Sequence, residues 1–255
     1  MPKNEIVLIG IGEVGGVFAK GFLRLGFTVH PVTRETDMDR LAQQVTQPEL
    51  VIVAVAENDL NLVLNELPDS WRSRLCLLQN ELLPDDWRGI PSPTVISIWF
   101  EKKPGIDPKV IIPSPLFGPQ STHVSRALDR VNIPTNILLD EDELLFQLVT
   151  KNLYILTTNI AGLHTGGTVS ELWQSHQAFA KRVAEEVICL QEALTHRSFD
   201  KERLIAAMLL AFEGDPDHRC MGRSAPARLL RALSHADRLN LELPQLRDLQ
   251  RTAVE

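Results

Sequence analysis

Short runs of apolar residues recur along the first part of the chain and alternate with segments of helical spacing. The runs are rich in Val, Ile and Leu, as in strands of a parallel sheet that is covered on both faces. The predicted strands are residues 5–9, 27–33, 49–56, 74–79, 94–99, 109–112 and 135–139. Helical spacing follows the first three, after residue 15 and at residues 36–45 and 57–66. This alternation predicts a doubly wound sheet with right-handed crossovers.

The pattern changes after residue 139, where strand-like runs end and helical periodicity takes over. The predicted helices are residues 144–163, 168–196, 200–213 and 224–240. Their predicted N-terminal caps are Asp140 with Glu143, Thr168 with Glu171, Asp200, and Ser224 with Pro226 in the first turn. We therefore expect an α/β domain at residues 1–140 and an all-helical domain at residues 141–255.

Glycines punctuate the junction between the first predicted strand and the helix that follows it. Gly10 would permit a tight turn, Gly12 would let a pyrophosphate approach the backbone, and Gly15 would let the helix pack closely on the strand. The phosphates would bind the amides of the helix N-terminus. The predicted nucleotide contacts are Gly10, Ile11, Gly12, Glu13, Val14 and Gly15. This order of elements is that of a Rossmann-type domain.

Arg34 stands at the end of the second predicted strand, where such a domain meets the nucleotide's ribose. An acid there would pair with the 2′-hydroxyl of NAD, whereas an arginine suits the 2′-phosphate of NADP. The adjacent Glu35 weakens this contrast, and an ordinary solvated arginine is the alternative. We prefer NADP as the cofactor.

Composition places the chain among ordinary globular proteins, with 44% hydrophobic and 23% charged residues. A net charge of -7 and a pI of about 5.5 argue against nucleic acid or an anionic membrane as the main partner. No signal peptide or membrane-spanning run is apparent, and the three cysteines are far apart, so we expect reduced thiols in the cytoplasm. The seven histidines show no metal-ligand pairing, and no metal site is predicted.

Lys151 lies in a predicted helix that is apolar on most of its circumference. Its side chain could extend to the surface, or it could face a cleft where partial burial lowers its pKa and lets it protonate a carbonyl oxygen. Asn159 is about two turns further along and within about a quadrant of the lysine around the axis. Asn80 follows the predicted strand at residues 74–79, and could be a turn residue or could contact the nicotinamide ribose or the substrate.

Together these residues resemble the ketopantoate reductase family, NADPH-dependent enzymes of the pantothenate pathway. Residues 10–34 are similar to that family's glycine turn, first helix and second strand, which end on the arginine that binds the 2′-phosphate. Gln79 and Asn80 resemble its Gln-Asn-Gly element, with Glu81 in place of the glycine. The layout of a Rossmann domain followed by a helical domain agrees over almost the whole chain.

The resemblance assigns roles to the helical domain as well. Lys151 followed by Asn159 is similar to the helix in which the family's lysine protonates the ketone and its asparagines bind substrate. The chain departs from the family at Ile155, where a second asparagine is usual, and at residues 56–57, where the family carries a lysine.

The largest departure lies at residues 218–228, where the family brings a glutamate that orients substrate and lysine. Ser224 falls near the place of that glutamate and is a candidate substrate contact. Arg219, Arg223 and Arg228 cluster in the same segment, which suits an anionic substrate other than ketopantoate or, alternatively, a solvated helix start.

Two hypotheses follow. The first is an NADPH-dependent reductase of a small carbonyl compound, a 2-oxo acid similar to ketopantoate, with Lys151 as proton donor. The second is a catalytically inactive protein of the same fold that senses NADP or binds a partner, because several members of the family's cooperating set are missing. In either case the apolar helical domain could supply the surface of a homodimer.

Overall fold

The computed structural model describes residues 4–252. Internal contacts divide the chain into two compact units, Met1–Gln147 and Leu148–Glu255. The long helix α5 (Glu141–Thr165) runs through the point of division. The boundary at residue 140 between an α/β domain and a helical domain stays a prediction. Each compact unit is described by itself below.

Among the described residues of the first unit, seven strands form one sheet in the order β2-β1-β3-β4-β5-β8-β9. The strands are β1 (Glu5–Ile9), β2 (Thr28–Val32), β3 (Leu50–Val53), β4 (Leu75–Leu77), β5 (Thr94–Ile96), β8 (Ser114–Phe117) and β9 (Thr135–Ile137). Neighbours pair in parallel except β5 with β8. The chain moves from β1 to β2 on one side and then to β3 on the other, which confirms the predicted doubly wound, mostly parallel sheet.

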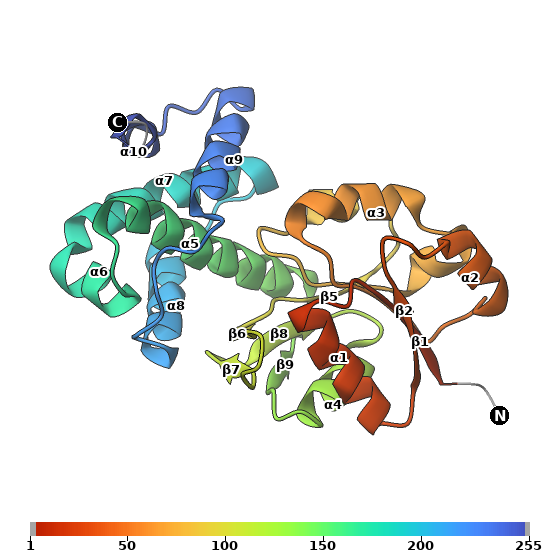
Figure 1. The fold of residues 1–255 in the computed structure, drawn as a ribbon. Coiled ribbons are helices and arrows are strands. Elements are labelled where there is room, and N and C mark those ends of the chain that lie inside the picture. Colours follow the sequence, from red (N-terminus) through yellow and green to blue (C-terminus); the bar gives the residue numbers. More distant parts are fainter. Residues whose placement is uncertain (1–3, 253–255) are drawn as a thin grey trace. The chain divides into compact units, whose positions relative to one another are not determined.

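Helices cover both faces of this sheet, with α1 and α4 side by side on one face and α3 on the other (Figure 1). The helical segments are α1 (Glu13–Arg24), α2 (Met38–Gln44), η1 (Glu57–Asp59), α3 (Leu60–Glu66), η2 (Asp69–Arg74), η3 (Pro84–Trp87) and α4 (Ser121–Asp129). Successive residues of the central strands β1, β3 and β4 are nearly all apolar and point alternately to opposite sides, so both faces of the sheet are apolar. Ile6 and Leu8 of β1 pack with Phe18 and Phe22 of α1, whereas Val7 is buried on the opposite face.

The predicted strand at residues 109–112 does not join the main sheet. It contributes β7 (Lys109–Val110), which pairs with β6 (Phe100–Glu101) in a separate antiparallel hairpin. The sequence patterns also missed β8 and α4. Pro115 interrupts the apolar run of β8, and α4 buries only a narrow stripe, so neither had a long periodic signal.

The second unit is helical, and the described residues 148–252 contain no strand, as predicted. Its helices are α5, α6 (Val169–Ser175), α7 (Gln177–Thr195), α8 (Lys201–Gly214), α9 (Ala225–Arg238) and α10 (Pro244–Thr252). Three of these helices, α5, α6 and α8, have the predicted side-chain caps at their N-termini. Asp140 accepts a hydrogen bond from the Glu143 amide at 2.8 Å, and Asp200 caps α8 at 2.9 Å. Thr168 and Glu171 form a reciprocal capping box on α6.

Two predictions about these helices are wrong. The helix predicted at residues 168–196 is broken at His176, whose backbone leaves the helical region and separates α6 from α7. Ser224 precedes α9, but its side chain makes no capping hydrogen bond; Pro226 in the first turn fixes the start of this helix instead.

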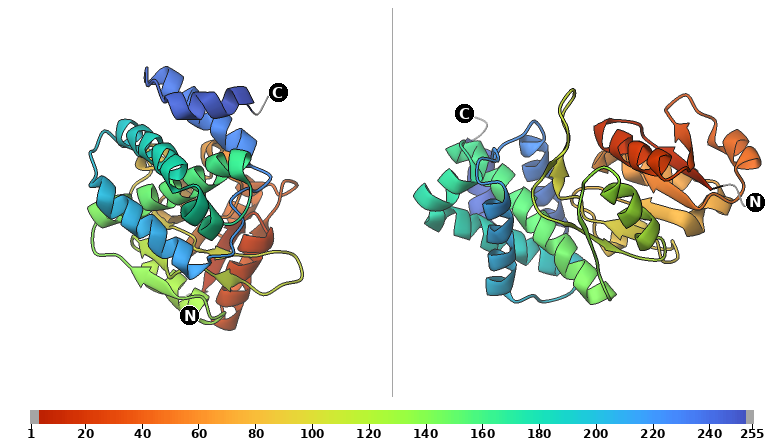
Figure 2. Two further views of the ribbon diagram at one scale, coloured as in Figure 1. Left: turned by 90° about the vertical axis from the view of Figure 1, so that its left-hand side faces the viewer. Right: turned by 90° about the horizontal axis from the view of Figure 1, so that it is seen from below.

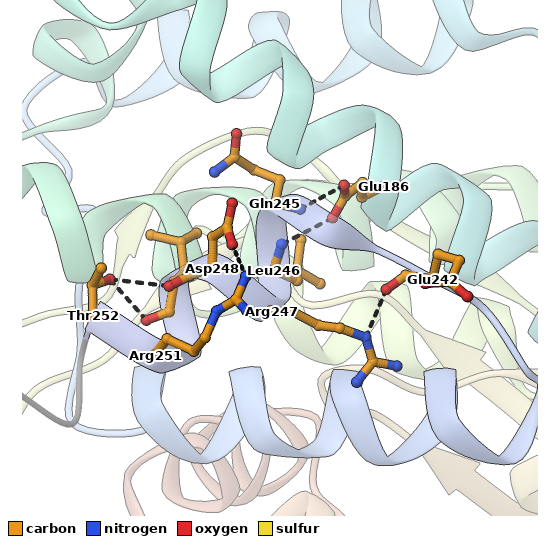
Figure 3. Close-up of polar contacts among 9 residues, drawn as sticks. Glu186, Glu242, Gln245, Leu246, Arg247, Asp248, Arg251 and Thr252 are labelled. Carbon is orange, nitrogen blue, oxygen red and sulfur yellow. Dashed lines mark hydrogen bonds and ion pairs between the residues drawn. The ribbon is translucent and has the colours of Figure 1, made fainter.

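Helix α10 was not predicted, because its cap comes from a distant part of the chain. Glu186 of α7 accepts hydrogen bonds from the backbone amides of Gln245 at 2.8 Å and Leu246 at 2.9 Å (Figure 3). A carboxylate at this end also interacts favourably with the helix dipole. Helix α10 packs against α7 and α9, and the left view of Figure 2 shows the dark-blue α10 close to the blue α9.

Candidate functional site

The glycine turn has the geometry that each of its glycines was predicted to permit. Gly10 has φ of +89°, and a Cβ there would lie 2.6 Å from the Ala54 carbonyl oxygen. A Cβ on Gly15 would lie 2.2 Å from the Gly10 carbonyl oxygen, so α1 can approach β1 only without a side chain at this position. At Gly12, in contrast, nothing lies within 4 Å of the Cβ position. The open side of the turn is therefore at Gly12, where a phosphate would approach.

The N-terminus of α1 is suited to an anion. Gly12 is the N-cap residue, and no side chain caps the helix there. The first-turn amides and the positive end of the helix dipole consequently face the opening above Gly12. Ile11 is half exposed beside it, while Glu13 and Val14 form the start of the helix. These residues fit the pyrophosphate of a dinucleotide.

A cavity of about 710 Å³ adjoins the turn at the carboxyl ends of β1, β2 and β3. Its lining combines Gly10, Ile11 and Gly12 with Arg34. It lies where the direction of strand addition reverses, the usual position of a nucleotide in an open α/β sheet. Thus four of the predicted cofactor contacts surround one cavity.

Arg34 reaches into solvent at the rim of this cavity, with its side chain 96% exposed. Its Nη2 lies 3.8 Å from Asp59 Oδ2, a long and exposed ion pair that contributes little to stability. The turn that carries Arg34 is fixed by hydroxyls, because Thr36 Oγ1 accepts from the Thr33 amide at 3.0 Å. Thr33 and Thr36 also line the cavity and could donate to a phosphate, a role that sequence patterns did not reveal.

Asn80 lies beyond this cavity, half-buried just after β4. The preceding Gln79 is buried and donates to the carbonyl oxygens of Val53 at 2.7 Å and Val55 at 3.3 Å, which ties the end of β4 to the end of β3. Glu81 has φ of +60°, a conformation that favours glycine, at the position where the family has one. The local backbone therefore fits the resemblance, and the role of Asn80 stays a prediction.

In the second unit, Lys151 and Asn159 are distinguished by their exposure. Within residues 148–162, these two residues are partly accessible and all the remaining residues are buried. Burial and, to a lesser extent, the nearby positive charge of Arg228 together lower the pKa of Lys151 from 10.5 to about 7. The lysine Nζ lies 5.7 Å from the centre of the Tyr154 ring. A lysine in this environment can give up its proton near neutral pH.

Asn159 is held by the first turn of α9 and by the segment that precedes this helix. Arg228 Nη1 donates to Asn159 Oδ1 at 2.7 Å, and Asn159 Nδ2 donates to the Cys220 carbonyl oxygen at 3.1 Å. This segment packs closely on α5, since a Cβ on Gly162 would lie 2.8 Å from Cys220 Cβ. Arg228, Asn159 and Lys151 thus form one cationic group, which we call the lysine cluster. Ser224 is exposed at the start of α9, and its contact with substrate stays a prediction.

No protein-family model matches the chain, and no curated protein matches it significantly in sequence. Solved structures do match its fold. A 2-dehydropantoate 2-reductase from Porphyromonas gingivalis W83 is 14% identical, with 98% of this chain and 99% of that one covered and a TM-score of 0.67. A probable 2-dehydropantoate 2-reductase from Bacillus subtilis is 18% identical, with the same coverage and TM-score. The chain has the ketopantoate reductase fold.

A further structural neighbour is D-mandelate dehydrogenase in a ternary structure with NADH and anilino(oxo)acetate. It is 13% identical, with 98% of this chain and 97% of that one covered and a TM-score of 0.66. At these identities the likeness establishes the fold, so the site residues are judged by their own geometry. Within residues 4–252, no helix combines the length and apolar character that crossing a membrane requires. In the same part of the chain, no group of three or more His, Cys, Asp or Glu residues could hold a metal ion.

Proposed function

We propose that the chain is an NADPH-dependent reductase of a small 2-oxo acid. The observation that carries the proposal is Lys151, a partly accessible lysine whose pKa is lowered to about 7 in the otherwise mostly buried stretch 148–162 of α5. A bound nicotinamide would supply the hydride to the carbonyl carbon. Lys151 would donate a proton to the carbonyl oxygen as the negative charge develops there.

The cofactor half of the proposal rests on the glycine turn and Arg34. Residues 10–15 would bind the pyrophosphate through their backbone, and Arg34 would bind the 2′-phosphate by charge-assisted hydrogen bonds. The hydroxyls of Thr33 and Thr36 would contribute to the same subsite. Asn80 would contact the nicotinamide ribose.

The substrate half rests on the lysine cluster and on Ser224. Two positive groups at Arg228 and Lys151 favour an anionic substrate, and the bond from Arg228 fixes the amide of Asn159. The 2-oxo acid class agrees with the oxo acid bound to the structurally similar D-mandelate dehydrogenase, whose cofactor there is NADH. We further propose a homodimer acting in the cytoplasm; a structurally similar ketopantoate reductase from Staphylococcus aureus is dimeric.

The second candidate is an NADP-binding protein without catalysis. Ile155 is buried where the resemblance would place a substrate-binding asparagine, which favours this reading. The test is a screen of NADPH oxidation against a panel of 2-oxo acids, alongside a titration of NADPH binding. Turnover with one of them supports the reductase, whereas tight NADPH binding without any turnover supports the sensor.

A further inference from the structure

An acidic residue occupies the glycine turn at the place where the proposed pyrophosphate would bind. Glu13 is the first residue of α1, and its side chain is 43% exposed. A carboxylate here would occupy the positive end of the helix dipole and repel an incoming phosphate. The turn can accept a dinucleotide readily only if this charge is compensated.

The compensating charge comes from a part of the chain 89 residues away. Lys102, in the turn of the β6–β7 hairpin, donates from Nζ to Glu13 Oε2 at 2.8 Å and to the Lys103 carbonyl oxygen at 2.6 Å. Its side chain is only 18% exposed, so the ammonium is held at this point. The neighbouring Lys103 pairs instead with Glu101 at 3.0 Å. The hairpin thus directs one of its two adjacent lysines to the glycine turn.

A second cavity, of about 750 Å³, adjoins the same glycine turn. Glu13 and Lys102 line it together with Ile11 and Gly12, and these last two residues also line the cavity of Arg34. The turn therefore separates two cavities. Lys20, Arg24 and Asp107 complete the charged part of the second lining.

We propose that Lys102 is a positioning residue for the cofactor, which neutralises Glu13 so that the glycine turn can accept the pyrophosphate. The inference rests on the proposed cofactor. Without the ammonium, the carboxylate would be left uncompensated at the helix N-terminus and would oppose the phosphates. With Lys102 in place, the pair is neutral and the helix dipole acts on the ligand without opposition.

The experiment measures the dissociation constant of NADPH by fluorescence titration of the full chain at low and high salt. Lys102→Met is expected to weaken binding about five- to tenfold, most strongly at low salt. Lys102→Arg keeps the charge and should bind within about twofold of the unaltered protein. Glu13→Gln should bind as tightly or more tightly, and adding Lys102→Met to it should cost little. Lys103→Met, on the same hairpin turn, is the matched control and should leave binding unchanged.

The outcomes separate this inference from the proposed function. If the unaltered chain does not bind NADPH, the proposed function fails and the role of Lys102 fails with it. If it binds but Lys102→Met binds equally well, only the role of Lys102 is refuted. A loss that persists in full in the Glu13→Gln background also refutes it, because the lysine would then act on the hairpin or the ligand rather than through Glu13. Thermal unfolding of each variant verifies that it is folded.

Discussion

Replacing Lys151 with methionine tests the proposed chemistry most directly. With a pKa of about 7, about half of the lysines carry a proton at pH 7, about one tenth at pH 8 and about one hundredth at pH 9. Since the ammonium is the proposed acid, kcat/KM should fall about tenfold per pH unit above neutrality. Methionine has a similar length and no proton to donate, so turnover should drop by at least ~10²-fold.

The assay is the initial rate of NADPH oxidation with an active 2-oxo acid between pH 6 and 9.5. The unaltered protein should show the alkaline decline, and Lys151→Met should lose both the rate and the decline. NADPH affinity should be nearly unchanged in the variant. Lys151→Arg keeps a positive charge that does not titrate in this range, so it is the matched control and should also be slow and insensitive to pH. Equal turnover in Lys151→Met, or an unchanged alkaline limb, would refute the reasoning.

The same variant should alter the pH dependence of stability. A lysine whose pKa is lower in the folded than in the unfolded state makes unfolding take up protons between about pH 7 and 10.5. Its burial therefore opposes folding fully below pH 7 and ceases to do so above pH 10.5. The free energy of unfolding should rise with pH in this window for the unaltered chain relative to Lys151→Met, as urea titrations at pH 7 and 9.5 would measure.

Three further substitutions have definite expectations. Arg34→Gln should weaken NADPH binding ~10- to 100-fold and leave NADH binding unchanged, with Asp59→Asn as a control that keeps the arginine; equal loss for both nucleotides would contradict the 2′-phosphate role. Glu186→Gln should lower the free energy of unfolding by about 1–2 kcal/mol in urea, and the exposed neighbour Glu185→Gln should not. Arg228→Gln should raise the pKa of Lys151, so the alkaline decline of the rate should move to higher pH. An unchanged decline would show that the charge of Arg228 does not affect the pKa of Lys151.

How far the sequence predicts the fold depends on how local each signal is. The strand at residues 5–9 and the cap at Thr168 were found because the run and the capping box lie within a few residues. Strand β8 was missed because Pro115 hides its apolar pattern and its antiparallel partner is set by tertiary structure. Helix α10 was missed because Glu186, which caps it, lies 59 residues before Gln245.

The same distinction applies to the site. Gly10 and Gly15 could be assigned from spacing alone, since the turn that requires them is local. The bond between Arg228 and Asn159 spans 69 residues, so a cluster of arginines in the sequence left open whether any of them turned inward. The pair of Lys102 with Glu13 had no sequence signal at all.

The altered residues 218–228, which include the first turn of α9, change the charge around the proposed proton donor, and this bears on substrate choice. The resemblance places an acid in this region, which would raise the pKa of a neighbouring lysine, whereas Arg228 lowers that of Lys151. Two cations in one partly buried cluster repel each other, and an anionic substrate would relieve that repulsion. A carboxylate beside Arg228 would also return the lysine's pKa upward, so the donor would be protonated most fully when substrate is bound. A neutral ketone would supply neither effect, and for this reason the lysine cluster favours an oxo acid over an uncharged carbonyl compound.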